Sequence, residues 1–558
     1  MIDALPPGSR ALVLAPTQEA ADEFVRGIAV ARGATFGIER LMFNRLIGLL
    51  AAAYAAEHGL AFLTGLGAQA LAARALFTLR GDPRVAWFGP VMELPGFARA
   101  VATAHEALSH NLVEAGRLRL VGGAGEALAA VFEQFDHELS SGRLLDRSAM
   151  IDAAINALAG PEGRRFTGIP LILLDVAADS LRERDLIAAL AARAPAAIAT
   201  VPACDDRSER FLAEALGLEY ASIERATPKS PASNSLACLQ EHLFADTLPP
   251  EAPLDESVML RSAAGEMQEC VELARQVQAA AREGVPFDRI AVLLHAPDRY
   301  AAYLEEAFAR AGIPAWFARG ASLPEPGGRA LLALLNCAAE RFSARRFAEY
   351  LSLAQLPDPA AAAASPAVAA DASFVPADAD FMPGGVEPAA GVADNDPDPV
   401  PQAQDEAESI VRAPWRWEQL LVDAAVVDGR ERWEKRLLGL ERELSLQRGE
   451  LKDDEARAAQ IDRNLADLAH LRAAALPIIG ALAALPAAAS WGEWLEQLRA
   501  LTVLAIRDRI EVLRTLAELE PMAPVGPITL DEVRLVLSQR LGRLPMRPPR
   551  RRYGAVMV

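Results

Sequence analysis

The sequence predicts an α/β protein in which two parallel-sheet units carry large helical insertions. Short apolar runs of strand length alternate with helical patterns near the N-terminus. That alternation is typical of parallel sheets with crossover helices. A second series of the same kind begins near residue 258, and long alanine- and leucine-rich segments with helical spacing separate the two series. The spacing of their apolar residues predicts helices rather than strands.

The first unit is expected over residues 1–60 and 150–250, interrupted by a helical insertion at 61–149. Its strands are predicted at 10–17 (RALVLAPT), 170–175 (PLILLD) and 197–201 (AIATV), and its helices at 18–31 and 181–193. Leu41, Phe43 and Leu46 add a further helical pattern. Strands this apolar are expected to be buried on both faces of a parallel sheet.

The second unit is expected to start within residues 255–356. Val258–Arg261 (VMLR) should open it, followed by a helix over 265–281 and a strand at Ile290–Leu294. A helix with apolar residues at Tyr300, Leu304 and Phe308 comes next. Gly312-Ile313-Pro314 should end that helix, because glycine suits a helix C-terminus and proline cannot continue a helix.

Two further segments follow. Residues 357–409 consist mainly of Ala, Pro, Asp and Val, and such a composition predicts a disordered insert because it offers little apolar surface to bury. Residues 410–545 have helical periodicity throughout, and they include a long antiparallel pair of helices. Residues 546–558 end in YGAVMV, which we interpret as an incomplete strand of the second unit.

Bulk composition narrows the class of protein. The 558 residues exceed one ordinary core, and the net charge of −19 is the wrong sign for a protein that coats nucleic acid. No apolar run of membrane-spanning length lacks a charge or proline, so we expect a cytoplasmic, bacterial location. Because the four cysteines (Cys204, Cys238, Cys270, Cys337) are far apart in sequence, we expect no metal site and no cofactor in this segment.

The sequence contains no phosphate-binding loop. Such a loop needs glycines and a Lys-Ser/Thr pair, and none of the three lysines (Lys229, Lys435, Lys452) follows a glycine. The first strand leads instead into Ala15-Pro16-Thr17-Gln18-Glu19, which puts a carboxylate where triphosphate charge would lie. No catalytic residue is therefore predicted.

Two other strand ends have the position of nucleotide-site residues without their chemistry. Asp175 ends a strand like the one that holds magnesium in ATPases, but the next residue is Val176 and not a glutamate that could orient water. We interpret Asp175 as a plain strand-end residue, with a vestigial metal-binding role as the alternative. His295 follows the strand at 290–294, and we expect it to be solvated.

The order strand, helix, Gly312-Ile313-Pro314, strand, helix over 290–353 resembles the second motor domain of UvrD-like superfamily-one helicases. It is most similar to AddB-type helicase–nuclease subunits, as is PWRWEQLLVDAAVVDGRERWEKRL at 414–437. The resemblance implies two RecA-like (P-loop NTPase-like) units, the second one truncated. It also implies a non-hydrolysing, helicase-like part of a protein that processes single-stranded or end DNA in recombinational double-strand break repair, with an AddA-like motor subunit as partner.

The same family carries a PD-(D/E)XK exonuclease domain with magnesium and an iron–sulfur cluster. The sole Glu-X-Lys of this chain, Glu450-Leu451-Lys452, lies in a charged helical segment, so we interpret it as a solvated helix face. If the gene encodes the nuclease, that domain is expected beyond Val558.

The candidates for nucleic-acid contact are arginines near the C-terminus: Arg540, Arg543, Arg547, Arg550, Arg551 and Arg552. Guanidinium groups along an extended segment could follow phosphates, and an exposed basic linker is the equal alternative. The tryptophans at 415, 417, 433, 491 and 494 could stack on bases, but at helical spacing they are expected in a core.

Two other functions stay open. The segment APTQEAADEF could correspond to a later helicase motif, in which case the chain would be an active ATP-dependent helicase whose first motif lies upstream of Met1. The chain could also be an interaction scaffold with no DNA role. ATPase assays distinguish the first possibility, and salt-dependent binding to a single strand distinguishes the second.

Overall fold

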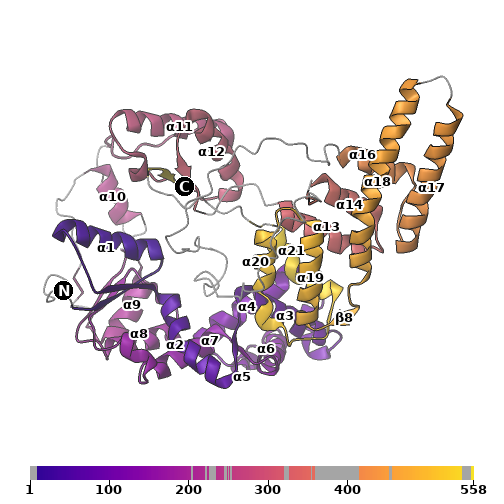
Figure 1. The fold of residues 1–558 in the computed structure, drawn as a ribbon. Coiled ribbons are helices and arrows are strands. Elements are labelled where there is room, and N and C mark those ends of the chain that lie inside the picture. The colour runs from indigo at the N-terminus through magenta and orange to yellow at the C-terminus, as the bar shows by residue number, and fades with distance from the viewer. Residues whose placement is uncertain are drawn as a thin grey trace.

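The structure is a computed structural model. It describes residues 9–202, 205–219, 223–224, 234–243, 248, 251, 254–318, 326–353, 355–357, 414–451, 455–542, 544 and 554–558. Apart from Pro357, the predicted insert at 357–409 lies outside the described residues. Three bodies are visible in Figure 1, which we call the sheet unit, the helical body and the small unit.

The sheet unit is built on a four-stranded parallel sheet of order β2-β1-β5-β6, so the α/β class and the parallel sheet are confirmed. Its strands are β1 Ala11–Ala15, β2 Ile38–Met42, β5 Leu171–Leu174 and β6 Ala197–Thr200. Strand β2 was missed by the sequence analysis, which placed only a helical pattern from Leu41 onward. Its sequence IERLM has two charges in five residues, because β2 is an edge strand in which three of the five residues are partly or fully exposed.

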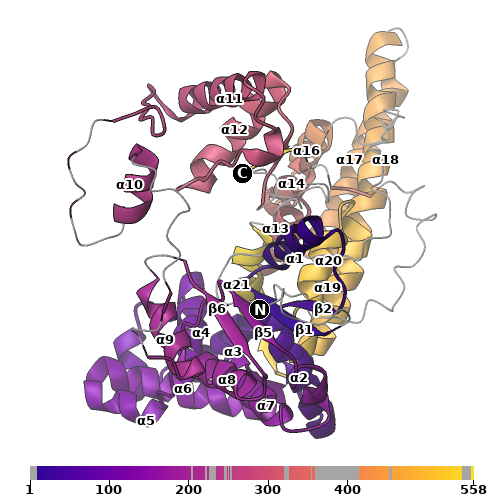
Figure 2. The ribbon, with the colours of Figure 1, turned by 90° about the vertical axis from the view of Figure 1, so that its left-hand side faces the viewer.

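Helices cover the two faces of this sheet unequally (Figure 2). Helix α1 lies on one face against β1 and β2, and the remaining helices lie on the other. Their bounds are α1 Gln18–Arg32, α2 Phe43–His58, α7 Arg147–Ala157, α8 Leu181–Ala191 and α9 Asp206–Leu216, with a 3-10 turn at Glu162–Arg165. Leu12, Leu14 and Leu173 point to the covered face and are fully buried, which makes them the centre of this core.

The helical body is formed by three segments that are far apart in sequence. The first segment contributes α3 Gly65–Thr78, η2 Pro83–Phe88, α4 Pro95–His110, α5 Ala115–Leu118, η3 Arg119–Val121 and α6 Gly123–Ser141. The second contributes α13 Pro326–Ala339 and α14 Ala344–Ser352. The third contributes α16 Pro414–Asp423, α17 Arg430–Glu450, α18 Glu455–Ala483, α19 Trp491–Ala505, α20 Ile510–Ala517, η8 Glu520–Met522 and α21 Leu530–Leu541. Their buried apolar residues form one continuous core.

Two pairs of short strands lie at the ends of helices of the helical body. Strands β3 (Ala61–Phe62) and β4 (Leu144–Leu145) pair in parallel, and β8 (Ala488–Ala489) pairs with β9 (Ile528–Thr529) in the antiparallel sense. Both β3 and β4 lie in the segment 61–149, which the sequence predicts to be a helical insertion. The sequence pattern does not reveal two-residue strands, because they are too short to show alternation.

Helices α13 and α14 belong to the helical body, although the sequence analysis placed residues 255–356 together in the second sheet unit. The reason is close backbone packing at the start of α13. A Cβ on Gly327 would lie 2.5 Å from the carbonyl oxygen of Asp508, and one on Gly328 would lie 2.3 Å from that of Leu541. Only glycine allows this approach, so α13 is held against α20 and α21.

The long antiparallel pair predicted within 410–545 is confirmed as α17 and α18, which project from the helical body as a hairpin (Figure 1). By length and composition, α18 is the one helix among the described residues that could cross a membrane. Core helices pass the same test, and α18 packs against α16, α17 and α19, with its Leu468, Leu471 and Ile478 buried.

The small unit contains α11 Glu266–Arg282, α12 Pro297–Ala311, β7 Ala315–Trp316 and β10 Val556–Met557, with a 3-10 turn at Phe287–Arg289. Strand β10 lies between β7 and Ile290–Val292, and all three run parallel. The expected C-terminal strand is therefore present, with Val556 fully buried. The predicted strand at 290–294 is reduced to a single bridge at Ala291, and Gly312 ends α12 with a φ of 66°, as predicted.

The predicted opening strand of this unit, Val258–Arg261, does not form. The side chains of Met259 and Leu260 are 61% and 97% exposed. Helix α10 (Ser235–His242) lies nearby in the sequence and hydrogen-bonds to Asp255 and Ser257 through its first amides.

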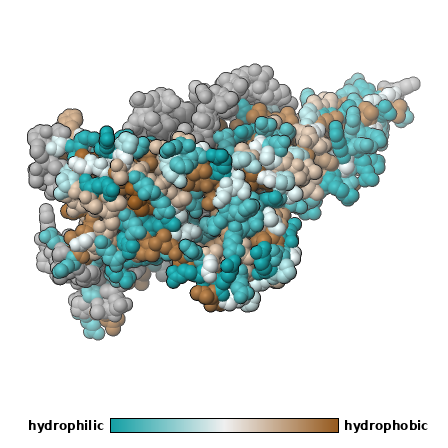
Figure 3. Space-filling view, turned by 90° about the horizontal axis from the view of Figure 1, so that it is seen from below, coloured by the Kyte–Doolittle hydropathy of each residue, from teal (hydrophilic) through white to brown (hydrophobic). Residues whose placement is uncertain are grey.

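On the face of the molecule seen from below, hydrophobic residues are interspersed among hydrophilic ones (Figure 3).

Candidate functional site

The carboxyl edge of the four-stranded sheet is the best candidate for a functional site. From β1 the chain continues to β2 on one side, and β5 continues to β6 on the other. The connections therefore diverge between β1 and β5, and such a switch point is where open α/β sheets bind ligands. The residues at the carboxyl ends of β1 and β5 decide which ligand could fit there.

The link from β1 to α1 is only two residues long. Strand β1 ends at Ala15, and α1 starts at Gln18. The Thr17 side chain caps the helix by accepting a hydrogen bond of 3.2 Å from the amide of Ala20. A loop that wraps phosphates with successive backbone amides needs more residues and glycines, so this link has no room for one.

Carboxylates occupy the first turn and a half of α1. Glu19 lies in the first turn of α1. Asp22 accepts a 3.1 Å hydrogen bond from the Gln18 side chain and forms a 3.0 Å ion pair with Arg40 of β2. Negative side chains stabilise a helix N-terminus through its dipole. They also repel a bound triphosphate, which would occupy the same end of the helix.

Asp175 directly follows β5 and has a left-handed backbone conformation, with a φ of 50°. Its carboxylate accepts a 2.8 Å hydrogen bond from the Thr200 hydroxyl, and its amide donates to the oxygen atoms of Thr200 at 3.1 and 3.2 Å. These bonds tie Asp175 to the end of β6. Val176, which stands where a catalytic glutamate would be needed, is 3% exposed. The arrangement favours the strand-end interpretation of Asp175.

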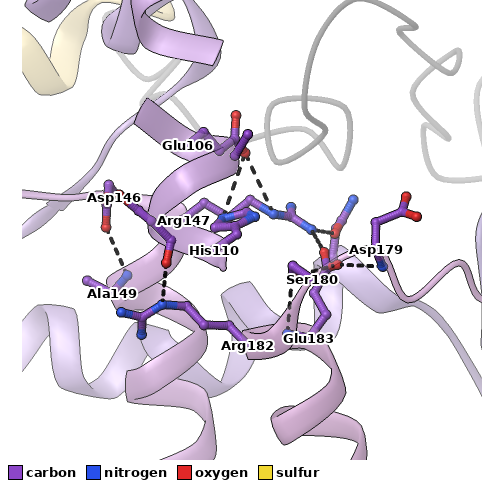
Figure 4. A network of polar contacts seen from close by, with 12 residues as sticks. Glu106, His110, Asp146, Arg147, Ala149, Asp179, Ser180, Arg182 and Glu183 are labelled. Carbon is purple, nitrogen blue, oxygen red and sulfur yellow. Dashed lines mark hydrogen bonds and ion pairs between the residues drawn. The ribbon is translucent and has the colours of Figure 1, made fainter. Parts of the chain in front are cut away.

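A buried polar network adjoins this edge and was missed by the sequence analysis (Figure 4). At its centre is Arg147, the first residue of α7, with a side chain only 12% exposed. Its guanidinium donates to Asn44 Oδ1 at 2.6 Å and to Glu183 Oε1 at 2.9 Å, and it lies 3.9 Å from Glu106 Oε1. Arg147 thus joins the helices that follow β2 and β5 to α4 of the helical body.

Glu183 is fixed in place by the start of α8. Its carboxylate accepts hydrogen bonds of 3.0 Å from the Ser180 hydroxyl and 3.2 Å from the Asp179 amide. In return, the Glu183 amide donates to the Ser180 oxygen at 3.3 Å. This reciprocal cap orients the glutamate before it meets Arg147.

Two titratable groups of α4 complete the network. His110 Nε2 lies 4.0 Å from Glu106 Oε1, one helical turn away. Burial, assisted by the positive charge of Arg147, lowers the pKa of His110 to about 4. Burial raises the pKa of Glu106, against the opposing effect of Arg147, and burial likewise raises the pKa of Asp146. His110 is therefore neutral at physiological pH.

The predicted nucleic-acid residues fall largely outside the described part of the chain. Arg543, Arg547, Arg550, Arg551 and Arg552 lie outside the described residues. Arg540 is described, and its guanidinium donates to Glu518 Oε1 at 2.8 Å within the helical body. Its side chain is 31% exposed. Because this ion pair occupies Arg540, its position does not favour a phosphate contact.

Other expectations can be compared directly with the structure. Trp417, Trp433, Trp491 and Trp494 are at most 5% exposed, which confirms that they belong to a core. His295 is exposed, as expected. The side chain of Trp415 and residue Lys452 lie outside what the structure describes.

No metal site emerges from the described residues. None of their His, Cys, Asp and Glu side chains form a group of three or more that could hold an ion. Cys270 is buried in the small unit and Cys337 in the helical body, while Cys238 lies on α10.

No local sequence pattern indicates the network around Arg147. Glu106 and His110 have the spacing of one helical turn, but their partners are about 40 to 80 residues away and are brought near only by packing. The chain matches no family model and no curated protein.

Proposed function

We propose that this chain is the helicase-like, non-hydrolysing part of a DNA-end-processing helicase–nuclease subunit of the AddB type. It would act in bacterial, cytoplasmic double-strand break repair by recombination, on single-stranded or end DNA. Its two sheet-containing units would be RecA-like, with an AddA-like subunit supplying ATP hydrolysis. Nuclease chemistry, with its magnesium and iron–sulfur cluster, would belong to a domain beyond Val558.

One observation carries the non-hydrolysing part of this proposal: the two-residue link Pro16–Thr17 at the switch point of the sheet. A nucleotide triphosphate at this place needs backbone amides and a lysine to balance its charge. The chain offers Glu19 and a Thr17 hydroxyl already used as a helix cap. Asp175 is bonded to Thr200, and Val176 cannot orient water.

The small unit supports the RecA-like part. Residues 290–292 and β7 lie on either side of β10, although more than 230 residues separate β7 from β10 in sequence. A parallel sheet whose central strand arrives from a distant segment is expected when a large insertion interrupts one sheet-containing unit. Helices α13 and α14 together with the helical segment 414–544 form that insertion in this interpretation.

The ATPase proposal is tested with purified protein, magnesium and ATP, in the presence and absence of single-stranded DNA. We expect no DNA-stimulated hydrolysis and no saturable binding of ATP by isothermal titration calorimetry. Turnover that rises on addition of single-stranded DNA would favour the active helicase instead. Tight magnesium-dependent ATP binding would equally contradict the proposal.

The DNA-binding part needs a separate measurement. We expect the Kd for a labelled single strand to rise with salt, because phosphate contacts release counterions. Replacing Arg550, Arg551 and Arg552 by alanine should weaken binding and reduce the salt slope by about one unit per lost contact. A matched control replaces three exposed arginines of α17, which are Arg430, Arg432 and Arg436. Absence of any salt-dependent binding would favour a scaffold without a DNA role.

A further inference from the structure

The sheet unit and the helical body meet at a boundary that contains little apolar packing. Their buried apolar residues form two separate clusters. The chain crosses directly between the two bodies at β3 and β4, which pair side by side through Ala61↔Leu144 and Phe62↔Leu145. Because the two crossings are adjacent, they define a single axis about which the bodies could rotate. The remaining contacts at the boundary therefore determine the relative orientation of the two bodies.

Those remaining contacts include polar ones at one end of α4. This helix packs against α7 and α8 of the sheet unit. Near its C-terminus it presents Glu106, the carbonyl of Ser109 and His110. Arg147 of α7 faces Glu106 (Figure 4). Arg182 of α8 donates to Ser109 O at 3.0 Å and also pairs with Asp152.

Other charged residues on α4 and on the elements packed against it have partners of their own. On α4 itself, His105 contacts Asp136 of α6 at 2.8 Å. The single charged residue of α3, Arg74, pairs with Glu532 of α21. The arginines of α21 are likewise engaged away from α4, Arg534 with Asp531 and Asn336, and Arg540 with Glu518. Arg147 and Arg182 are thus the cations that α7 and α8 direct at α4.

We propose that Arg147 and Arg182 form a latch that holds α4 on the sheet unit, with the β3–β4 pair as the hinge. Closed, the latch fixes one orientation of the helical body on the carboxyl edge of the sheet. Open, it lets the helical body turn while each body keeps its own core. Charged groups suit such a latch, because guanidinium and carboxylate groups that separate can form hydrogen bonds with water instead. Opening the latch therefore exposes no apolar surface.

The position of the latch couples it to the candidate site. Asn44, which binds Arg147, follows β2, and Ser180 and Glu183 follow the loop that begins at Asp175. A ligand that moved this loop would move the partners of Arg147 as well. The latch itself does not depend on the DNA-related function proposed above, because it follows from the contacts between the bodies alone.

Hydrogen–deuterium exchange of the full chain tests the latch. In Arg147→Met, we expect the amides of residues 102–110 to exchange about tenfold faster or more, since opening of the boundary releases the end of α4. Amides of β1 and of α19 should stay within about twofold of the wild-type rate, because both cores remain folded. Small-angle scattering should show a larger radius of gyration for the variant.

Arg184→Met is the matched control, because Arg184 also lies on α8 but pairs with Asp185 and Glu214 inside the sheet unit. It should leave exchange in residues 102–110 unchanged. Arg182→Met provides a second test if Arg147→Met unfolds, and it should produce the same localised increase. The proposal is overturned if both latch variants accelerate exchange everywhere, or if neither accelerates it at the end of α4.

Discussion

The helical body and the small unit are held together in different ways. The helical body joins three distant segments around a core that contains Trp433, Trp491 and Trp494, each at most 1% exposed. Among the described residues, the core cluster of the small unit has nine buried residues, of which Phe308 is the one aromatic, and it depends on a strand contributed by the last residues of the chain. Stability of a body rises with the apolar surface that it buries. We therefore expect the small unit to open before the helical body does.

The largest effect should follow from Trp494→Ala in the helical body. The indole is fully buried and donates a 2.9 Å hydrogen bond to Ile528 O. Its loss creates a cavity and leaves a carbonyl without its partner, at a cost of about 3–5 kcal/mol. Urea denaturation followed by circular dichroism measures this change. The control is Trp87→Ala, since Trp87 is 66% exposed, and an equal loss in the control would contradict the comparison.

A smaller and strictly local effect is expected from Leu304→Ala in the small unit. Leu304 of α12 is fully buried in the core of the small unit. The substitution should cost about 2–3 kcal/mol. Hydrogen exchange should accelerate in α11 and α12 while the amides of α19 keep their wild-type rates. Equal acceleration in both bodies would show that they unfold as one cooperative unit.

Low pH should destabilise the helical body more than the small unit, because the helical body contains the buried His110. Its pKa is about 4 in the folded chain and near 6.5 when unfolded, so the folded state resists protonation. Neutral His110 therefore makes its full contribution to the free energy of unfolding above pH 6.5, and this contribution is lost as the pH falls toward 4. We expect His110→Gln to abolish about 1–2 kcal/mol of this acid-dependent loss. The described buried residues of the small unit include no histidine or carboxylate, so no matching dependence is expected there.

Thermal unfolding between pH 7.5 and pH 4.5 measures this difference, with His137→Gln as the control because His137 is exposed. Glu106 and Asp146, whose raised pKa values act in the opposite sense, are present in both proteins. Parallel pH profiles for wild type and His110→Gln would exclude His110 as the source of acid sensitivity.

The smallest effect is expected at the surface of the small unit. Arg310 pairs with Glu306 one helical turn away at 3.3 Å, and both side chains are more than 60% exposed. Such a pair contributes little because solvent screens it, so Arg310→Ala should change stability by less than about 0.5 kcal/mol. Denaturant titration of the variant provides the measurement, and a loss comparable to that of Leu304→Ala would disprove this ranking.

Much of the fold followed from local sequence patterns. Apolar runs located β1, β5 and β6, and Gly312 located the end of α12. Strand β2 was missed because an edge strand carries charges, and Val258–Arg261 was assigned to a strand because its pattern is apolar although no neighbour covers it. Local pattern reports the tendency of a segment, whereas pairing decides whether the strand forms.

The candidate site divides in the same way. The missing phosphate loop between Ala15 and Gln18 was evident from residue types, because the chemistry depends on neighbours in the chain. The network around Arg147 could not be predicted, since Asn44, Glu106 and Glu183 reach it from three other helices. Burial of a charge is a property of the packed structure, and the printed sequence alone does not reveal it.

The amino-acid order alone determined where apolar and helical segments lie, and that no lysine stands ready for a phosphate. Only the tertiary structure decided that α13 and α14 join the helical body, that β10 enters a sheet more than 230 residues after β7, and that Arg147 connects two bodies. The physical reason is that patterns along the chain act over a few residues, whereas cores and buried ion pairs depend on segments that meet only after folding.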